Sequence, residues 1–259
     1  MGRPENSRVT SASRPIRAAT FDVTHTLIHS PRLAEIYWQV LRRHGHAVGL
    51  RDVRREIPRV WQEFSCRVDH RIDRFTAHPR GARGYWQEFL VRLCQCLGTE
   101  EPSRFAGAEL FGQFARAESW EVYPDVRKTL RNLRSAGIRL GVVSNWDHRL
   151  PQLLQELDLN PYFEAIVWSE DCGLEKPHPQ IFHRCLEELG VSPEECLHVG
   201  DHAIDDVEGA QGAGLRALRI DREKGCGGLG KLFESLLKGP QVPSEEGLTT
   251  HDGGRHVRR

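Results

Sequence analysis

The second half of this 259-residue chain alternates short apolar runs with amphipathic segments that have helical spacing. Runs of this length suit buried strands better than buried helices. Strands separated by helices usually pair in parallel, because two parallel strands need a long crossover between them and a helix supplies it. We therefore predict a parallel β-sheet with helices on both faces, an α/β, Rossmann-like architecture. The predicted strands in this half are residues 138–143, 165–168, 197–199 and 215–220.

An earlier apolar run, residues 16–23, predicts one more strand, but no comparable run follows it until residue 138. The intervening residues instead carry apolar side chains at helical spacing. We therefore predict that an α-helical cap domain is inserted after the first strand. The expected organisation is listed by residue number: a core of 15–30 and 120–238, a cap of 31–119, hinges near 29–31 and 120–124, and polar, disordered tails at 1–14 and 239–259.

Composition argues against a nucleic-acid or membrane partner. The 36 basic and 36 acidic residues cancel, so no global charge attracts the chain to a polyanion or a lipid surface. No apolar stretch approaches the roughly 20 residues that span a bilayer, and no signal peptide is evident at the N-terminus. The seven cysteines include no CxxC pair, which fits a reducing compartment. We expect a cytoplasmic protein; its oligomeric state is not predicted.

Four polar motifs each end or follow a predicted strand. In a parallel sheet, such motifs meet beyond the carboxyl ends of the strands, where ligands bind. Together they supply a carboxylate nucleophile, hydroxyl and amide donors for anionic oxygens, a cation, and oxygen ligands for a divalent metal, the set that phosphoryl transfer needs. The motifs are Asp22-Val23-Thr24-His25-Thr26, Ser144-Asn145, Glu175-Lys176-Pro177, and Gly200-Asp201 with Asp205 and Asp206.

In this order the motifs resemble those of the haloacid dehalogenase-like hydrolase superfamily, over roughly residues 16 to 225. The inserted helices are similar to the α-helical cap of its subfamily I. The resemblance implies that Asp22 attacks phosphorus and forms an aspartyl-phosphate. It also implies that Lys176 holds the nucleophile and the phosphate together by charge.

The resemblance further implies a Mg²⁺ cofactor, which prefers hard oxygen ligands. Asp22, the Thr24 carbonyl and Asp201 would be direct ligands, and Asp206 would hold a metal-bound water. Asp205 competes with Asp206 for that last role, because either one could instead cap the helix that starts there.

Ser144 and Asn145 lie where a strand ends and a helix soon begins, so we expect them to contact the phosphate oxygens of a substrate. Capping of that helix is the alternative role for the pair. Thr24 and His25 are also expected beside the substrate. Trp146, which directly follows Asn145 in the sequence, is a candidate for the wall of the pocket.

Thr24 departs from the family pattern. Family phosphatases usually have a second aspartate two residues after the nucleophile, and it protonates the leaving group. A threonine hydroxyl cannot do this at neutral pH, and general acid catalysis contributes about 10² to 10⁴ in rate. His25, His29 or water could substitute, although a histidine near a sharp turn is more often structural.

Three functions remain open from the sequence. The leading one is a Mg²⁺-dependent phosphatase of small phosphorylated metabolites. A metal-independent 2-haloacid dehalogenase is favoured by Thr24 but opposed by Asp201, whose charge would repel a carboxylate substrate. A catalytically weak phosphate-binding or scaffold protein is the third.

Overall fold

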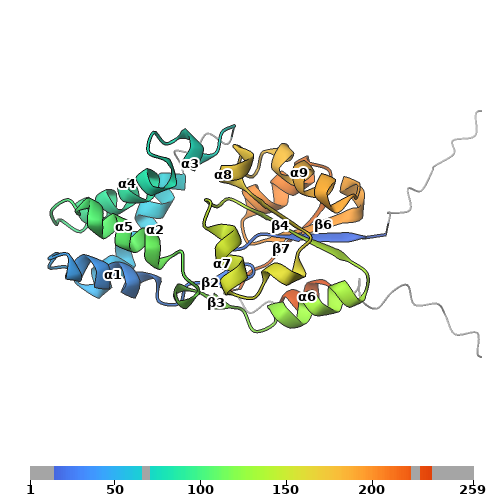
Figure 1. Cartoon of the computed structure of the whole chain (residues 1–259), viewed down its shortest axis with the longest axis horizontal. Coiled ribbons are helices and arrows are strands. Elements are labelled where there is room, and N and C mark those ends of the chain that lie inside the picture. Colours follow the sequence, from blue (N-terminus) through green and yellow to red (C-terminus); the bar gives the residue numbers. More distant parts are fainter. Residues whose placement is uncertain (1–14, 66–70, 223–227, 235–259) are drawn as a thin grey trace, which may run out of the picture.

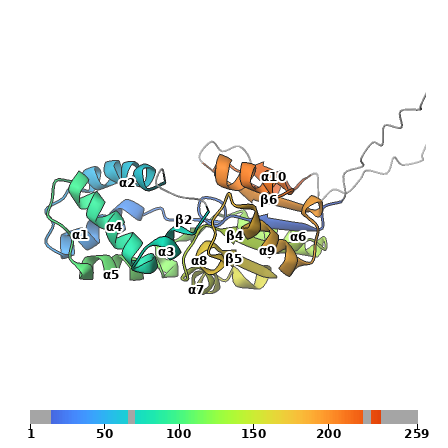
Figure 2. The same ribbon diagram turned by 90° about the horizontal axis from the view of Figure 1, so that it is seen from above.

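The computed structural model describes residues 15–65, 71–222 and 228–234. A bundle of helices lies beside a sheet that is flanked by helices (Figure 1), and the two groups stay separate in the perpendicular view (Figure 2). The tails predicted at residues 1–14 and 239–259 lie outside the described residues. Within the described residues, no helix has the length and apolar character that crossing a membrane requires.

The sheet has five parallel strands in the order β5-β4-β1-β6-β7, which confirms the predicted architecture. The central strand β1 pairs with β4 and β6, and its four residues are all buried. Asp22, which follows β1, therefore lies at the middle of the sheet's carboxyl edge. The strands are β1 (Ala18–Phe21), β4 (Arg139–Ser144), β5 (Ala165–Trp168), β6 (Cys196–Gly200) and β7 (Arg216–Arg219).

Alternate residues of β1 enter different hydrophobic clusters, as the period of two in a strand requires. Ala19 and Phe21 pack with α6 and α7, whereas Ala18 packs with α9 and α10. Both faces of the sheet are therefore covered. The helices of this part are α6 (Val126–Ser135), α7 (Leu150–Glu156), α8 (Ser169–Cys172), α9 (Pro179–Leu189), α10 (Gly209–Gly212), α11 (Leu229–Leu232) and a π-helix (Ala203–Glu208).

The bundle has a hydrophobic cluster of its own, centred on aromatic residues of its helices. The Phe89 ring lies 5.3 to 6.0 Å from the rings of Phe64, Trp61, Trp86 and Tyr37. Helices were predicted within residues 31–119, and they form there; the exact domain limits remain a prediction. The helices are α1 (Leu33–Arg43), α2 (Leu50–Ser65), α3 (Arg74–Ala77), α4 (Gly81–Cys96) and α5 (Arg104–Gln113).

The two chain segments that connect the bundle to the sheet run side by side. They form a short antiparallel ribbon of β2 (Ile28–His29) and β3 (Glu121–Val122). The His29 imidazole stacks on the Tyr123 ring at 4.4 Å, with 17° between their planes. This ribbon lies where we predicted the hinges, and motion about it remains a prediction.

Buried polar contacts join the bundle to the sheet at the loop after β4. The Trp86 indole donates to Asp147 at 2.9 Å, and the Arg149 guanidinium forms an ion pair with the same carboxylate at 2.5 Å. Arg149 also donates to the Phe111 carbonyl at 2.8 Å and lies 3.7 Å from the Phe111 ring centroid. These contacts hold α4 and α5 next to the edge of the sheet that carries Ser144.

We expect the aromatic cluster around Phe89 to stabilise the bundle. Phe89→Ala should lower the free energy of unfolding by about 3 to 5 kcal/mol, because it leaves a cavity among packed rings. Phe105 on α5 is 65% exposed, so Phe105→Ala should change stability by no more than about 0.5 kcal/mol. Urea unfolding followed by circular dichroism would measure both variants, and equal losses would contradict the described packing.

Candidate active site

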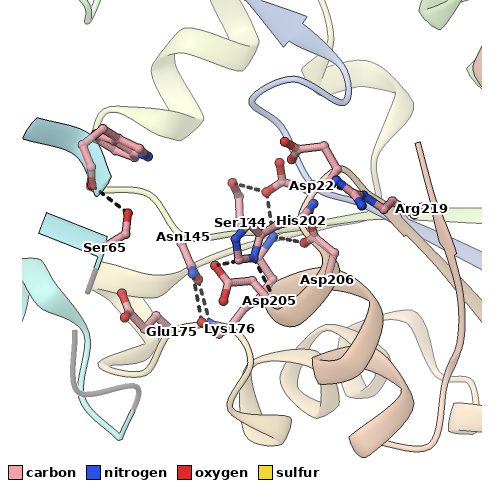
Figure 3. A network of polar contacts seen from close by, with 12 residues as sticks. Asp22, Ser65, Ser144, Asn145, Glu175, Lys176, His202, Asp205, Asp206 and Arg219 are labelled. Carbon is pink, nitrogen blue, oxygen red and sulfur yellow. Dashed lines mark hydrogen bonds and ion pairs between the residues drawn. The ribbon is translucent and has the colours of Figure 1, made fainter. Parts of the chain in front are cut away.

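The predicted site residues meet at the carboxyl edge of the sheet, as Figure 3 shows. Asp22 directly follows β1, Ser144 ends β4 and Asp201 directly follows β6. Lys176 reaches the same point from the segment between α8 and α9. Ser65, the last residue of α2, lies on the bundle side of this cluster in Figure 3.

Lys176 connects two carboxylates at the centre of the site. Its ammonium donates to Oδ1 of Asp22 and to Oδ1 of Asp206, each at 2.6 Å. The Ser144 hydroxyl donates to the same Asp22 oxygen at 3.0 Å. Lys176, Asp22 and Asp206 are all buried, at 2%, 7% and 1% exposure. The contacts therefore act in a medium that screens charge much less than water does.

The charges of the site shift the pKa of each group. Burial alone would lower the pKa of Lys176, but the Asp206 and Asp22 charges overcome it, so that pKa is raised and the side chain stays an ammonium. Burial raises the pKa of Asp22, and the Lys176 charge opposes this. For Asp206, the Lys176 charge and the His198 contact outweigh burial, so its pKa is lowered.

Three carboxylates lie close enough to share one cation. Asp22, Asp201 and Asp206 each offer an oxygen, and these oxygens lie within 4.8 Å of one another. Burial, together with the charges of Asp22 and Asp206, raises the pKa of Asp201 to about 7. A divalent cation would relieve this repulsion, and carboxylate oxygens are the ligands that Mg²⁺ prefers. The donor set therefore fits the expected cofactor.

Asp205 and Asp206 have different surroundings in the structure, and the role of either one in holding a metal-bound water remains a prediction. Asp206 lies in the cluster, where its Oδ2 accepts from the His202 N–H at 2.9 Å. Asp205 instead lies 3.5 Å from the His202 ring. His202 itself caps the π-helix by accepting from the Asp205 N–H, so neither aspartate is the cap. Gly200 makes room for Asp206, because a Cβ there would lie 2.1 Å from the Asp206 Cγ.

The Asn145 side chain forms hydrogen bonds with the backbone of the loop that carries Lys176. Its amide nitrogen donates to the Lys176 carbonyl at 3.0 Å, and its amide oxygen accepts from the Lys176 N–H at 2.7 Å. Both polar ends of the amide are therefore engaged by backbone. The contact that the structure gives Asn145 positions Lys176, whereas we predicted a contact with substrate phosphate.

Thr24 and His25 form the turn after the nucleophile. His25 is exposed, has φ of 59° and donates its N–H to the Ile28 carbonyl at 2.7 Å. This left-handed conformation is uncommon for residues other than glycine. Trp146 is only 8% exposed, and its ring lies 5.2 Å from that of Trp120, so it packs in the core rather than forming an open pocket wall.

Comparison with known proteins agrees with this arrangement. The profile of haloacid dehalogenase-like hydrolases matches residues 16–214. The chain belongs to the haloacid dehalogenase-like hydrolase family. It is therefore a hydrolase, which confirms the family and the enzyme class that the motifs predicted.

Three relatives of this haloacid dehalogenase-like hydrolase illustrate the likeness. The glyceraldehyde 3-phosphate phosphatase of Methanopyrus kandleri is 32% identical over 221 residues, covering 81% of this chain and 85% of that protein. Haloacid dehalogenase-like hydrolase domain-containing protein 3 of Xenopus laevis is 26% identical and covers 79% and 84% of the two chains. The crystal structure of a phosphatase of the family from Thermococcus onnurineus has a TM-score of 0.56, 26% identity and coverage of 82% and 89%.

Sequence reasoning missed a buried histidine beneath the site of this hydrolase. The His198 Nε2 lies 3.3 Å from Oδ1 of Asp206, and its Nδ1 lies 3.0 Å from the Thr20 hydroxyl. Burial lowers the pKa of His198, which favours the neutral ring. Because a carboxylate only accepts, Nε2 carries the proton and Nδ1 accepts from Thr20. A signal existed, since His198 interrupts an otherwise apolar strand.

The raised pKa of Asp201 predicts how Mg²⁺ binding depends on pH. Without metal this carboxyl takes up a proton near pH 7, whereas Mg²⁺ binds the ionised form. Affinity for Mg²⁺ should therefore rise about tenfold between pH 6 and pH 8, with a proton released on binding near pH 7. Calorimetric titration in buffers of different ionisation enthalpy would measure both. Equal affinity at the two pH values would contradict the raised pKa.

Proposed function

We propose that this protein is a cytoplasmic, Mg²⁺-dependent phosphatase of small phosphorylated metabolites that works through an aspartyl-phosphate. The observation that carries the proposal is the Asp22 carboxylate, held between the Lys176 ammonium and the Ser144 hydroxyl beside two further carboxylates. The relative from Methanopyrus kandleri, named for the hydrolysis of a small phosphorylated aldehyde, supports the same class of substrate.

Asp22 is the nucleophile in this proposal. Within the described chain, the hydrogen bonds of its carboxylate from Lys176 and Ser144 both go to Oδ1, so Oδ2 is assigned the attack. Oδ2 forms a bond to phosphorus as the bond from phosphorus to the leaving oxygen breaks. That oxygen departs with the bonding electron pair and takes up a proton from water, because Thr24 cannot supply one. In the second step a water oxygen bonds to phosphorus as the bond from phosphorus to Oδ2 breaks. Inorganic phosphate leaves with the protons of the water, and Asp22 returns to a carboxylate.

The other residues stabilise charge and geometry. The Lys176 ammonium fixes the orientation of Asp22 and offsets negative charge on an incoming phosphate. Ser144 donates to the nucleophile and is near enough to contact a phosphate bound there. Asp22, the Thr24 carbonyl and Asp201 would hold Mg²⁺, and Asp206 would hold a metal-bound water. When bound, Mg²⁺ would supply positive charge against the phosphate oxygens.

Thr24 favours a second candidate, a 2-haloacid dehalogenase, because a halide leaves without a proton. Asp201 and Asp206 oppose it, since they would repel a substrate carboxylate and have no function in that reaction. Purified protein should hydrolyse p-nitrophenyl phosphate with Mg²⁺ and lose the activity with a chelator. Chloride release from 2-chloropropionate without phosphate release would overturn the proposal in favour of the dehalogenase. If the protein showed neither activity, the result would favour a phosphate-binding protein.

The nucleophile is tested by Asp22→Asn. We expect phosphatase activity to fall to background, because the amide has nearly the same shape but cannot form the acyl phosphate. Asp171 is an exposed aspartate that pairs with Arg184, so Asp171→Asn is a matched control that should keep full activity. Steady-state release of inorganic phosphate measures both, and circular dichroism verifies the fold. An active Asp22→Asn protein would rule out the covalent route.

The absent acid is tested by Thr24→Asp. With no carboxylic acid at residue 24, the rate should fall steeply as the leaving-group pKa rises, so aryl phosphates should react much faster than sugar phosphates. The variant should raise turnover of an alkyl phosphate by up to about 10², and it should scarcely change p-nitrophenyl phosphate, whose leaving group needs no proton. A flat dependence on leaving-group pKa in the wild-type protein would mean that another group, such as His25, supplies the proton.

A further inference from the structure

Arg222 holds the turn that follows the proposed nucleophile. Its Nε and Nη2 donate to the Thr26 carbonyl at 3.2 and 2.6 Å. Its Nη1 donates to both carboxylate oxygens of Asp125, at 2.9 and 3.1 Å. The side chain is 10% exposed. Two parallel N–H groups on one carbonyl are the fixed fork geometry that a guanidinium provides and an ammonium does not.

The bonded turn contains the backbone that the proposed function assigns to the metal. Residues 24–27 loop back so that the Val23 carbonyl accepts from the N–H groups of Thr26, Leu27 and Ile28. Replacing Arg222 would remove the guanidinium partner of the Thr26 carbonyl. Because Thr26 is fully buried, that carbonyl would be left as an unpaired buried acceptor, which costs about 1 to 3 kcal/mol. The turn would then shift, and the Thr24 carbonyl would shift with it.

The same guanidinium contacts the connection to the helical bundle. It lies 4.2 Å from the centroid of the Tyr123 ring. The Tyr123 ring in turn stacks on the His29 ring at 4.4 Å. The Tyr123 N–H also donates to the Leu27 carbonyl at 3.1 Å. Arg222 therefore joins the nucleophile turn to both segments that lead into the bundle.

We propose that Arg222 is a positioning residue for the metal site: by fixing the Thr26 carbonyl, it sets the place of the Thr24 carbonyl relative to Asp22 and Asp201. The inference rests on the proposed function in its choice of Mg²⁺. It goes further in assigning a task to a residue about two hundred positions away in sequence from the turn that it holds. Partners that orient metal ligands typically change metal affinity or activity by about 10- to 100-fold when they are removed.

The test compares Arg222→Gln with Arg222→Lys by calorimetric titration of Mg²⁺, together with the Mg²⁺ dependence of p-nitrophenyl phosphate hydrolysis. Arg222→Gln should weaken Mg²⁺ binding about tenfold or more. Arg222→Lys should keep the ion pair with Asp125 and remain folded, yet also bind Mg²⁺ more weakly, because one ammonium cannot replace the fork on Thr26. Arg184, an exposed arginine that pairs with Asp171 and Glu188, gives the matched control Arg184→Gln, which should bind Mg²⁺ as the wild type does.

The outcomes separate a positioning role from a structural one. The proposal would be overturned if the melting temperature fell in both variants while their Mg²⁺ affinity stayed at the wild-type value. If Arg222→Gln does not fold, weakened binding in folded Arg222→Lys supports the proposal and unchanged binding overturns it. A wild-type protein that binds Mg²⁺ but cleaves no phosphate ester would refute the proposed phosphatase, and the titrations would still decide the role of Arg222.

Discussion

The ammonium of Lys176 between two buried carboxylates is the interaction on which the rest of the site depends. Removing charged groups from water is expensive, and a buried ion pair is stable only with good geometry and further hydrogen bonds. Ser144, His198 and the His202 N–H supply those bonds. Lys176 also ties the end of β1 and the π-helix after β6 to the segment before α9. Loss of the ammonium alone would leave two carboxylates facing each other in a medium of low polarity.

Much of this architecture could be predicted from the sequence, because strand and helix periods differ and because parallel strands bring their carboxyl ends together. The sheet, the helices before Glu121 and the convergence of Asp22, Ser144, Lys176 and Asp201 all follow from that reasoning. The contribution of each residue to catalysis remains a proposal.

Other features could not be predicted, because they depend on contacts between residues far apart in sequence or on local helix type. The segment Ala203–Glu208 is a π-helix, and Asp206 within it contacts Lys176, whereas the sequence left the choice between Asp205 and Asp206 open. Asn145 and Arg222 each bond to a carbonyl in a distant segment. Nothing in the pattern of either neighbourhood indicates such a partner.

The pairing of β2 with β3 constrains how the helical bundle can move. Two separate single-chain tethers would bend independently and let the bundle swing in any direction. Cross-linked by backbone hydrogen bonds and by the ring stack of His29 on Tyr123, they act as one strap. Any movement of the bundle relative to the sheet must therefore carry both connecting segments together, next to the turn that follows Asp22.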